Sequence, residues 1–363
     1  MKTLLPFLFL LLLAKTITAQ DPTFSQFNFN KLYLNPAFAG HNGGTSFNFN
    51  NHHHLVRVPG EYRVTSASMD TQSPCNNLGF GLMFMNEQEG VVPIQRNTFA
   101  LSGAYIFDKV FKEYFKGLKF DNDKELAFSV GLALKYVQVA VNTDNAIFSS
   151  QLDNIRGIVG TAPITNAMLG NTDYVDSDIG FVGVYNQTGF LLSNITFSFS
   201  INHLRATNPD ESLQDLGVLR PTKYTSYAAF DFPFHIGKAH FNLSPHFLFN
   251  KQGTLENFIW GTYLMGNVTK QSSTGVYGGF FYENTWYPSL QDANSFIINV
   301  GINGIEFNNS PTTYSIGYSL DIPNRGLNLG TSHEVSIRVN LPGAAIFCPT
   351  GAQNLLNCNK FIQ

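Results

Sequence analysis

The most informative property of this 363-residue chain is its shortage of charge. Asp, Glu, Lys and Arg make up 13% of the residues, about half of their share in an ordinary soluble domain. The net charge is -3 and no basic stripe is present, which leaves nucleic-acid binding without support. The aromatic fraction of 14% excludes intrinsic disorder, because disordered chains are poor in aromatic residues and rich in charge.

Long apolar runs are also scarce. None of about 18 residues occurs after the N-terminus, which excludes a polytopic helical membrane protein. The apolar run Leu4 to Ala14 follows Lys2 and precedes small residues, as in a secretory signal peptide. We predict that residues 1–19 form this signal and that cleavage follows Ala19. A single anchoring helix is the alternative, but the run is too short to span a bilayer.

Cysteine is rare, with three residues in the chain. Cys348 and Cys358 lie in the C-terminal tail, where an exported protein can oxidise such a pair, so they are a candidate disulfide. Cys75 stands alone in a polar turn. A metal site built from these thiols is disfavoured, because the chain has no CxxC pair and no histidine at ligand spacing beside them.

What the chain does contain is strict alternation of apolar and polar residues. In one segment Phe296, Ile298 and Val300 alternate with polar Asn299 and small Gly301. Each such segment has an apolar and a polar face, as in a β-strand. We predict strands at 45–57, 62–71, 78–88, 96–108, 125–140, 178–187, 190–203, 223–235, 239–250, 254–268, 274–283, 295–307, 312–322 and 331–341.

Two architectures can use these strands, a soluble sandwich or a transmembrane barrel. A sandwich of this size would expose a face rich in Lys and Glu, whereas the polar face here is Ser, Gly, Asn and Thr. Aromatic residues gather at strand ends, as in the interfacial girdles of barrels. We therefore predict an all-β fold, a transmembrane antiparallel β-barrel of about 14 strands.

The predicted strand count is even, as in bacterial single-chain barrels. With both termini in the periplasm, most long connections face outside. The expected organisation is a signal peptide at 1–19, an N-terminal periplasmic or plug segment at 20–44, the barrel at 45–341 and a periplasmic tail at 342–363. The apolar connection 141–177 is expected to fold over the barrel or to pack against a partner, such as a secreted adhesin or a surface lipoprotein.

Several motifs carry a resemblance to a known family. They are QDPTFSQ at 20–26, LYLNPAFAG at 32–40, the histidines at 52–54, NLGFG at 77–81, GGFFY at 278–282, SHEVSI at 332–337 and Cys348 with Pro349. Together they resemble the PorP/SprF family of outer-membrane proteins, which belong to the type IX secretion and gliding motility machinery. The likeness spans almost the whole chain after the signal peptide.

This resemblance implies a non-enzymatic component of a Gram-negative outer membrane, without a cofactor. Its expected role is to support the secretion and surface display of proteins such as adhesins with C-terminal sorting domains. The implied partners are other type IX components, periplasmic and peptidoglycan-associated proteins, secreted cargo and outer-membrane lipids, and no nucleic acid.

The site candidates from the opening motif are Asn35, Pro36, Ala37, Phe38 and Gly40. Proline holds the preceding residue extended and cannot donate to a strand ladder, so this stretch is not a regular barrel strand. We predict that residues 20–40 fold into the barrel mouth or contact a periplasmic partner. A disordered leader is the alternative.

Catalytic and metal-binding patterns are weak. His52 and His54 share one strand face, but no carboxylate neighbours them in sequence before Glu61. The sequence Ser332-His333-Glu334 has the residue types of a catalytic triad, yet adjacent strand residues point apart. Asp173, Asp176 and Asp178 lack the glycine turn of a calcium loop. The sequence therefore predicts neither an enzyme nor a metal site.

A rival function belongs to another class. Asn-Pro-Ala near the start of a 14-stranded barrel also resembles the hatch of long-chain fatty-acid transporters, which would make the protein an outer-membrane channel for hydrophobic small molecules. Such a path needs large apolar residues that point into the lumen, whereas the predicted inward faces are Gly, Ser and Asn.

Overall fold

The structure is a computed structural model, and it describes most of the chain after residue 20. The described ranges are 21–54, 62–73, 77–90, 94–107, 124–141, 152–153, 157–158, 171–187, 192–204, 220–237, 239–267, 274–286, 293–307, 311–324 and 330–342. The predicted signal peptide, Cys75, the candidate disulfide and most of the apolar connection lie outside these residues.

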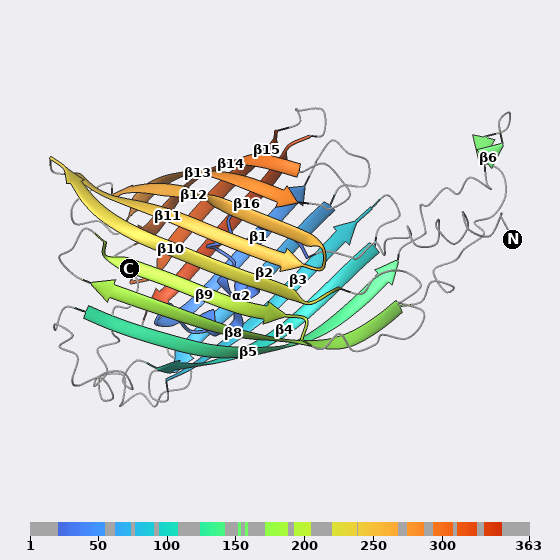
Figure 1. Cartoon of the computed structure of the whole chain (residues 1–363), viewed down its shortest axis with the longest axis horizontal. Helices are drawn as coiled ribbons and strands as arrows, with labels where there is room; N and C mark the ends of the chain where they lie inside the picture. Colours follow the sequence, from blue (N-terminus) through green and yellow to red (C-terminus); the bar gives the residue numbers. More distant parts are fainter. Residues whose placement is uncertain are drawn as a thin grey trace, which may run out of the picture.

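Fourteen antiparallel strands form one closed barrel (Figure 1), which confirms the predicted fold class. The barrel strands are β1 Gly44–His54, β2 Tyr62–Ser73, β3 Leu78–Glu89, β4 Ile94–Phe107, β5 Lys124–Val141, β8 Asn171–Gln187, β9 Asn194–Asn202, β10 Lys223–Ile236, β11 Ala239–Gln252, β12 Leu255–Asn267, β13 Gly275–Trp286, β14 Ala293–Glu306, β15 Thr313–Pro323 and β16 Ser332–Pro342. Outside it, β6 Leu152–Asp153 and β7 Gly157–Ile158 pair with each other.

The barrel closes where the first strand meets the last. β1 pairs with β16 over ten residue pairs, from Gly44 opposite Pro342 to His53 opposite His333. We call this junction the closing seam. Closure leaves no strand edge with unpaired backbone groups, which is the condition for a sheet to cross a lipid bilayer. Among the described residues, no helix is both long and apolar enough to span a membrane.

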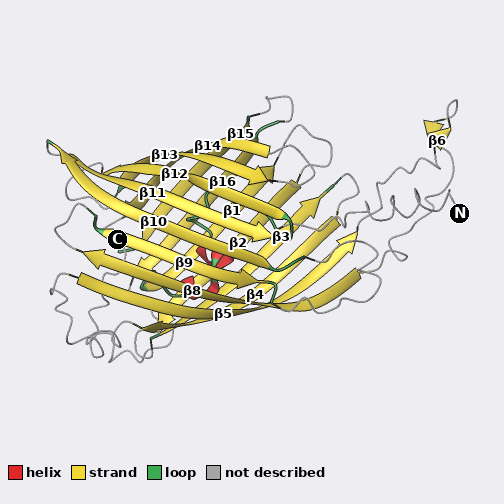
Figure 2. Ribbon diagram, viewed as in Figure 1, coloured by secondary structure: helices red, strands yellow, loops and turns green. Residues whose placement is uncertain are grey.

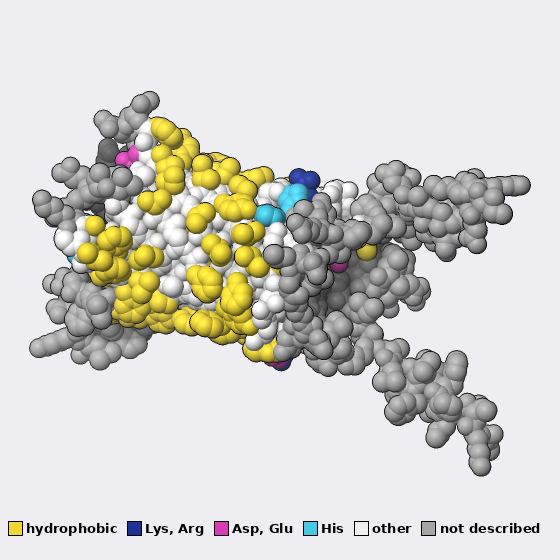
Figure 3. Space-filling view, turned by 90° about the horizontal axis from the view of Figure 1, so that it is seen from above, with side chains coloured by type: hydrophobic (Ala, Val, Ile, Leu, Met, Phe, Trp, Pro, Cys, Tyr) yellow, Lys and Arg dark blue, Asp and Glu magenta, His cyan; other side chains and the backbone are white. Residues whose placement is uncertain are grey.

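The outer wall is apolar, as the alternation predicts. Large apolar side chains are exposed on every barrel strand except β2, and Leu132 and Leu134 are 59% and 61% exposed. Figure 3 shows hydrophobic side chains spread over the wall, with the charged and histidine side chains near its two ends. This is the surface that a barrel presents to lipid.

The largest difference from the predicted strand bounds is in β8. The prediction begins this strand at residue 178, but it begins at Asn171. The sequence here carries acidic residues, which are typical of a loop. In the structure Asp176 and Asp178 point inward and have ionic partners in the lumen, so the strand continues through them.

Residues 21–43 lie inside the barrel, and we call them the lumen segment. They contain one short helix, α2 Lys31–Leu34, and one 3-10 turn, η1 Pro36–Phe38. Figure 2 shows the helical residues within the ring of strands. Most side chains of the segment are buried, including Phe24, Phe27 and Phe38. The core of this protein is therefore the lumen, filled by the chain's own N-terminal part.

The lumen segment runs from one rim of the barrel to the other. Asp21 contacts Gln252 and Arg220, beside the end of β11 and the start of β10. We call this end the loop rim, because β5 and β9 end there and β8 and β10 begin there. At the other end Gly40 lies against Thr71, near the end of β2. We call this end the turn rim.

Candidate functional site in the barrel lumen

Apolar contacts hold the middle of the lumen segment. Phe27, Leu34, Ala37 and Phe38 form one buried cluster with inward-facing wall residues. The wall residues come from six strands, β8 and β10 to β14, and are Val182, Val184, Tyr227, Ala229, Leu248, Ile259, Tyr263, Phe281 and Ile297. Phe27 meets the ring of Phe281 edge-on, with the centroids 5.8 Å apart. This half of the lumen is packed like a protein interior.

The Asn-Pro-Ala motif fixes the segment to the wall. The Asn35 amide nitrogen donates to the carbonyl oxygens of Phe181 in β8 and Phe199 in β9, both at 3.0 Å. Its side-chain oxygen accepts from the backbone N–H of Ala37 at 2.9 Å, which caps η1. Pro36 is the first residue of that turn, where its missing N–H costs nothing. One asparagine therefore both starts the turn and joins it to two strands.

The wall is shaped to admit the motif. A side-chain carbon at Gly180 would overlap the Asn35 side-chain oxygen, so only glycine allows this approach. Gly40 has a φ of 70°, a conformation that favours glycine, and lies against the backbone of β2 and β3. The structure thus places all five candidate residues of the opening motif in the lumen, in contact with the barrel.

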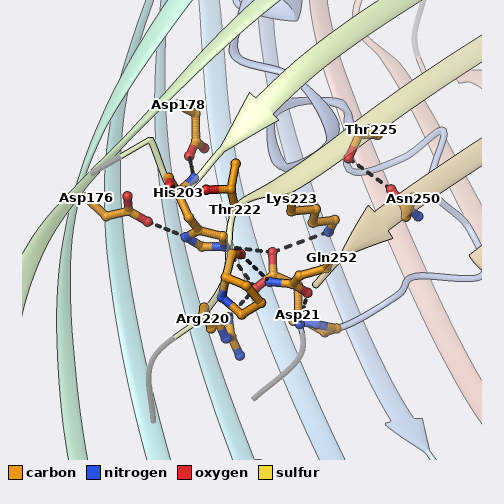
Figure 4. A network of polar contacts seen from close by, with 12 residues as sticks. Asp21, Asp176, Asp178, His203, Arg220, Thr222, Lys223, Thr225, Asn250 and Gln252 are labelled. Carbon is orange, nitrogen blue, oxygen red and sulfur yellow. Dashed lines mark hydrogen bonds and ion pairs between the residues drawn. The ribbon is translucent and has the colours of Figure 1, made fainter. Parts of the chain in front are cut away.

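An ionic network fixes the loop-rim end of the lumen segment (Figure 4). The Asp21 carboxylate lies 2.9 Å from Arg220, 3.0 Å from His203 and 3.4 Å from Lys223. Arg220 also pairs with Glu87 of β3. The backbone N–H of Asp21 donates to the Gln252 side chain at 2.8 Å.

The surrounding charges set the ionisation of this network. Burial opposes the charge on Asp21, but His203, Arg220 and Lys223 outweigh it and hold the pKa of Asp21 well below its ordinary value. Burial also opposes the charge on His203, but the negative charge of Asp21 and the hydrogen bond that the ring donates to Asp176 raise its pKa. The pairing therefore favours the charged form of both groups.

Asp176, Asp178 and His203 lie close enough together to be a candidate metal centre. Their ligand atoms are already used, however. Lys135 lies 2.5 Å from Asp178, and the two ring nitrogens of His203 contact Asp176 and Asp21. Protein cations therefore already neutralise this cluster.

A second polar cluster lies near the loop rim on the opposite side of the lumen. Glu334 of β16 accepts the backbone N–H groups of Ser25 and Gln26 at 2.7 and 3.2 Å. The Ser25 hydroxyl donates to Asp321 of β15. His52 of β1 lies 3.8 Å from Asp321 and 4.0 Å from Glu334. We call His52, Asp321 and Glu334 the seam cluster, because they span the closing seam.

The other sequence candidates are placed as follows. His52 and His54 share the inward face, with ring centroids 5.7 Å apart, and His54 contacts Ser332. Ser332 and Glu334 point inward, whereas His333 points outward toward Tyr318, so these three adjacent residues form no triad. The contacts of these three residues are hydrogen bonds within the barrel and lack the geometry of a catalytic triad.

Sequence reasoning missed the large apolar side chains that point into the lumen. Leu248, Ile259 and Phe281 are almost completely buried there. The signal in the sequence is weak, because β11 to β13 have apolar residues on both faces and the alternation is blurred. Their contacts are with the lumen segment, which explains why they are tolerated inside a barrel.

These features define a class of protein, a closed transmembrane barrel of outer-membrane type with an internal N-terminal segment. The sequence gives the family. Residues 16–339 match the family described as "Type IX secretion system membrane protein PorP/SprF". The chain belongs to this family, which confirms the resemblance and places the protein in the outer membrane as a type IX secretion component. No curated protein sequence matches the chain.

Solved barrels are similar in architecture. CdiB from Acinetobacter baumannii has 9% identity and a TM-score of 0.39, with 82% of this chain and 60% of that chain covered. This chain thus spans less than two thirds of CdiB. A Pseudomonas aeruginosa FadL homologue has 11% identity and a TM-score of 0.40, with 82% and 89% covered. The COG4313 outer membrane channel from Pseudomonas putida F1 has 14% identity and a TM-score of 0.37, with 82% and 95% covered.

Proposed function

We propose that this protein is a non-conducting outer-membrane platform that supports type IX secretion and surface display of proteins such as adhesins with C-terminal sorting domains. In this role it binds cargo and periplasmic or peptidoglycan-associated components at its rims, and cargo does not pass through its lumen. Family membership supports the secretion role. The observation that carries the non-conducting role is the lumen segment.

The segment is tied to nearly every side of the barrel. Its hydrogen bonds reach eleven of the fourteen barrel strands, namely β1, β2, β5, β8, β9, β10, β11, β12, β13, β15 and β16. A peptide that binds the wall all around cannot move aside without breaking many buried contacts. The segment therefore behaves as part of the core.

The lumen wall itself supports a permanent plug. Removing the segment would expose Leu248, Ile259 and Phe281 to water and would leave Glu334 without two hydrogen-bond donors. Burial of apolar area is the main driving force of folding. This wall is consequently built to hold a peptide.

The same observation bears on the channel alternative. Large apolar residues do point into the lumen, as a hydrophobic path requires, but the lumen segment covers them. A diffusing apolar molecule would have to displace Phe27 and Phe38 from this cluster. We therefore rank the platform above the channel.

We further propose that the signal peptide is cleaved after Ala19 and that the loop rim faces outside. The new N-terminus then lies one residue before Asp21, close to the external end of the lumen. In this proposal Asn35, Pro36 and Ala37 hold the lumen segment in place. The connection 142–170 and the tail 343–363 are the proposed contact regions for cargo and periplasmic partners.

Gene deletion followed by proteomics of the cell surface and culture supernatant tests the secretion role. We expect the loss of one or a few large surface proteins. A normal surface proteome with impaired fatty-acid uptake would reverse the ranking. Conductance of the purified barrel in planar bilayers tests the platform separately, because a steady open pore contradicts it whatever the cargo is.

A further inference from the structure

The seam cluster contains two buried carboxylates that no protein cation neutralises. Glu334 is 0% exposed and Asp321 is 5% exposed. Within the described ranges no lysine or arginine forms an ion pair with either one, and His52 is their nearest basic group. Burying an ionised carboxylate without a cation costs several kcal/mol per ion. A bound cation would therefore stabilise the ionised form of this cluster.

The geometry of His52 shows what is missing. Its Nδ1 lies 3.0 Å from the backbone oxygen of Thr23. A carbonyl oxygen only accepts, so Nδ1 carries the proton and the neutral ring presents a lone pair at Nε2. This Nε2 is buried without a hydrogen-bond partner, and so is Asp321 Oδ1. The other carboxylate oxygen, Oδ2, accepts the Ser25 hydroxyl and lies 3.8 Å from Nε2. The lone pair of His52 and the open oxygen of Asp321 thus belong to neighbouring groups.

This arrangement is typical of a histidine that binds a metal. A ligating histidine usually donates its other ring N–H to a backbone carbonyl or a carboxylate, which fixes the ring. Zinc binds imidazole nitrogen and carboxylate oxygen at about 2.0–2.2 Å, so two ligand atoms of one tetrahedral ion lie roughly 3.4 Å apart. His52 Nε2 and Asp321 Oδ2 are 3.8 Å apart, so a small rotation of either side chain brings them to that spacing.

We propose that His52 Nε2 and the Asp321 carboxylate bind a divalent transition-metal ion of the zinc class, with Glu334 supplying further negative charge. Nitrogen and oxygen donors together favour such an ion over calcium or magnesium, which prefer oxygen alone. The ion satisfies both orphaned atoms and neutralises the carboxylates. Water and the Ser25 hydroxyl, which already contacts Asp321, are available to complete its coordination.

The other acidic cluster provides the contrast. At Asp176 and Asp178 both nitrogens of His203 have partners, and Lys135 and Arg220 supply positive charge nearby. At the seam cluster, no lysine or arginine of the described residues forms an ion pair with the carboxylates. His52 Nε2 and one oxygen of Asp321 also have no hydrogen-bond partner. Only the seam cluster therefore needs an ion.

The ion would join three strands and the lumen segment. His52 lies on β1, Asp321 on β15 and Glu334 on β16, so the site lies across the junction that closes the barrel. Thr23 orients His52, and Ser25 bonds to both carboxylates. Metal binding should therefore stabilise both the closing seam and the binding of the lumen segment inside the barrel. This inference does not depend on the secretion role.

The test uses the full mature barrel purified in detergent. The protein is stripped with a chelator, loaded with zinc and assayed for bound metal and for thermal unfolding. We expect one zinc per chain and a melting temperature that rises with zinc and falls with chelator. The variants His52→Gln and Asp321→Asn should each lose the zinc and the temperature shift.

Two matched controls make the result specific. His203→Gln removes the histidine of the other acidic cluster, and His246→Gln removes a buried lumen histidine whose ring contacts the Tyr227 hydroxyl. Both should keep one zinc per chain. Loss of zinc from His203→Gln, or zinc binding unchanged in Asp321→Asn, would overturn the proposal. If His52→Gln does not fold, the isosteric Asp321→Asn variant decides the matter, and a wild-type barrel that binds no zinc refutes it.

Discussion

Replacing Asn35 by alanine should loosen the lumen segment. The side chain makes three hydrogen bonds, to Phe181, Phe199 and Ala37, at 3.0, 3.0 and 2.9 Å. At about 1 kcal/mol net for each bond, the variant should lose about 3 kcal/mol of docking free energy. Since 1.4 kcal/mol is a factor of ten, the undocked population should rise by roughly 100-fold.

Hydrogen exchange measures this change directly. Amides of residues 21–43 should exchange faster in Asn35→Ala by about that factor, because local opening sets their exchange. Brief openings should appear in bilayer recordings that are absent from the wild type. The matched control is Asn51→Ala in β1, which loses one 2.7 Å bond to Thr65 and does not touch the lumen segment. Equal exchange of residues 21–43 in both variants would refute the anchoring role of Asn35.

Three further predictions concern other parts of the barrel. Gly180→Ala should displace the Asn35 side chain and destabilise the protein in thermal unfolding, and it should add little in an Asn35→Ala background, since both changes remove one contact; full additivity would contradict this. The pKa of Asp21 is lowered in the folded protein, so its contribution to folding stability is present above about pH 4 and is lost as pH falls. The pKa of His203 is raised, so its contribution to folding stability is complete below about pH 6.5 and is lost as pH rises through the raised value. His203→Gln should therefore flatten the alkaline side of the stability profile, and an unchanged profile would exclude this contribution. Leu132→Arg, on the outer wall, should cost about 2–4 kcal/mol in lipid vesicles, while Leu132→Met should be close to neutral.

The strand pattern could be predicted from the sequence because lipid imposes one simple rule on every strand. Outward residues such as Phe296, Ile298 and Val300 must be apolar wherever they lie, so alternation alone identifies β14. The rule weakens where the inner face is also apolar. It fails at the start of β8, where Asp176 and Asp178 resemble loop residues until their partners in the lumen are known.

The lumen site was only partly predictable. The Asn35-Pro36-Ala37 motif marked a non-strand segment, because proline restricts the backbone locally. Its partners Phe181 and Phe199 lie more than 140 residues away, and no local rule links them to it. The same is true of Asp21 with Arg220, and of His52 with Asp321.

The sequence by itself determined that this chain is an exported barrel whose outer wall meets lipid, since a 13% charge content with alternating apolar residues permits little else. It also determined the family, through motifs that run along the chain. Only the tertiary structure decided that the lumen is filled and that two acidic clusters lie at one rim. Lipid acts on each residue separately, whereas the lumen joins residues from eleven strands through barrel closure, and that closure is a property of the whole chain.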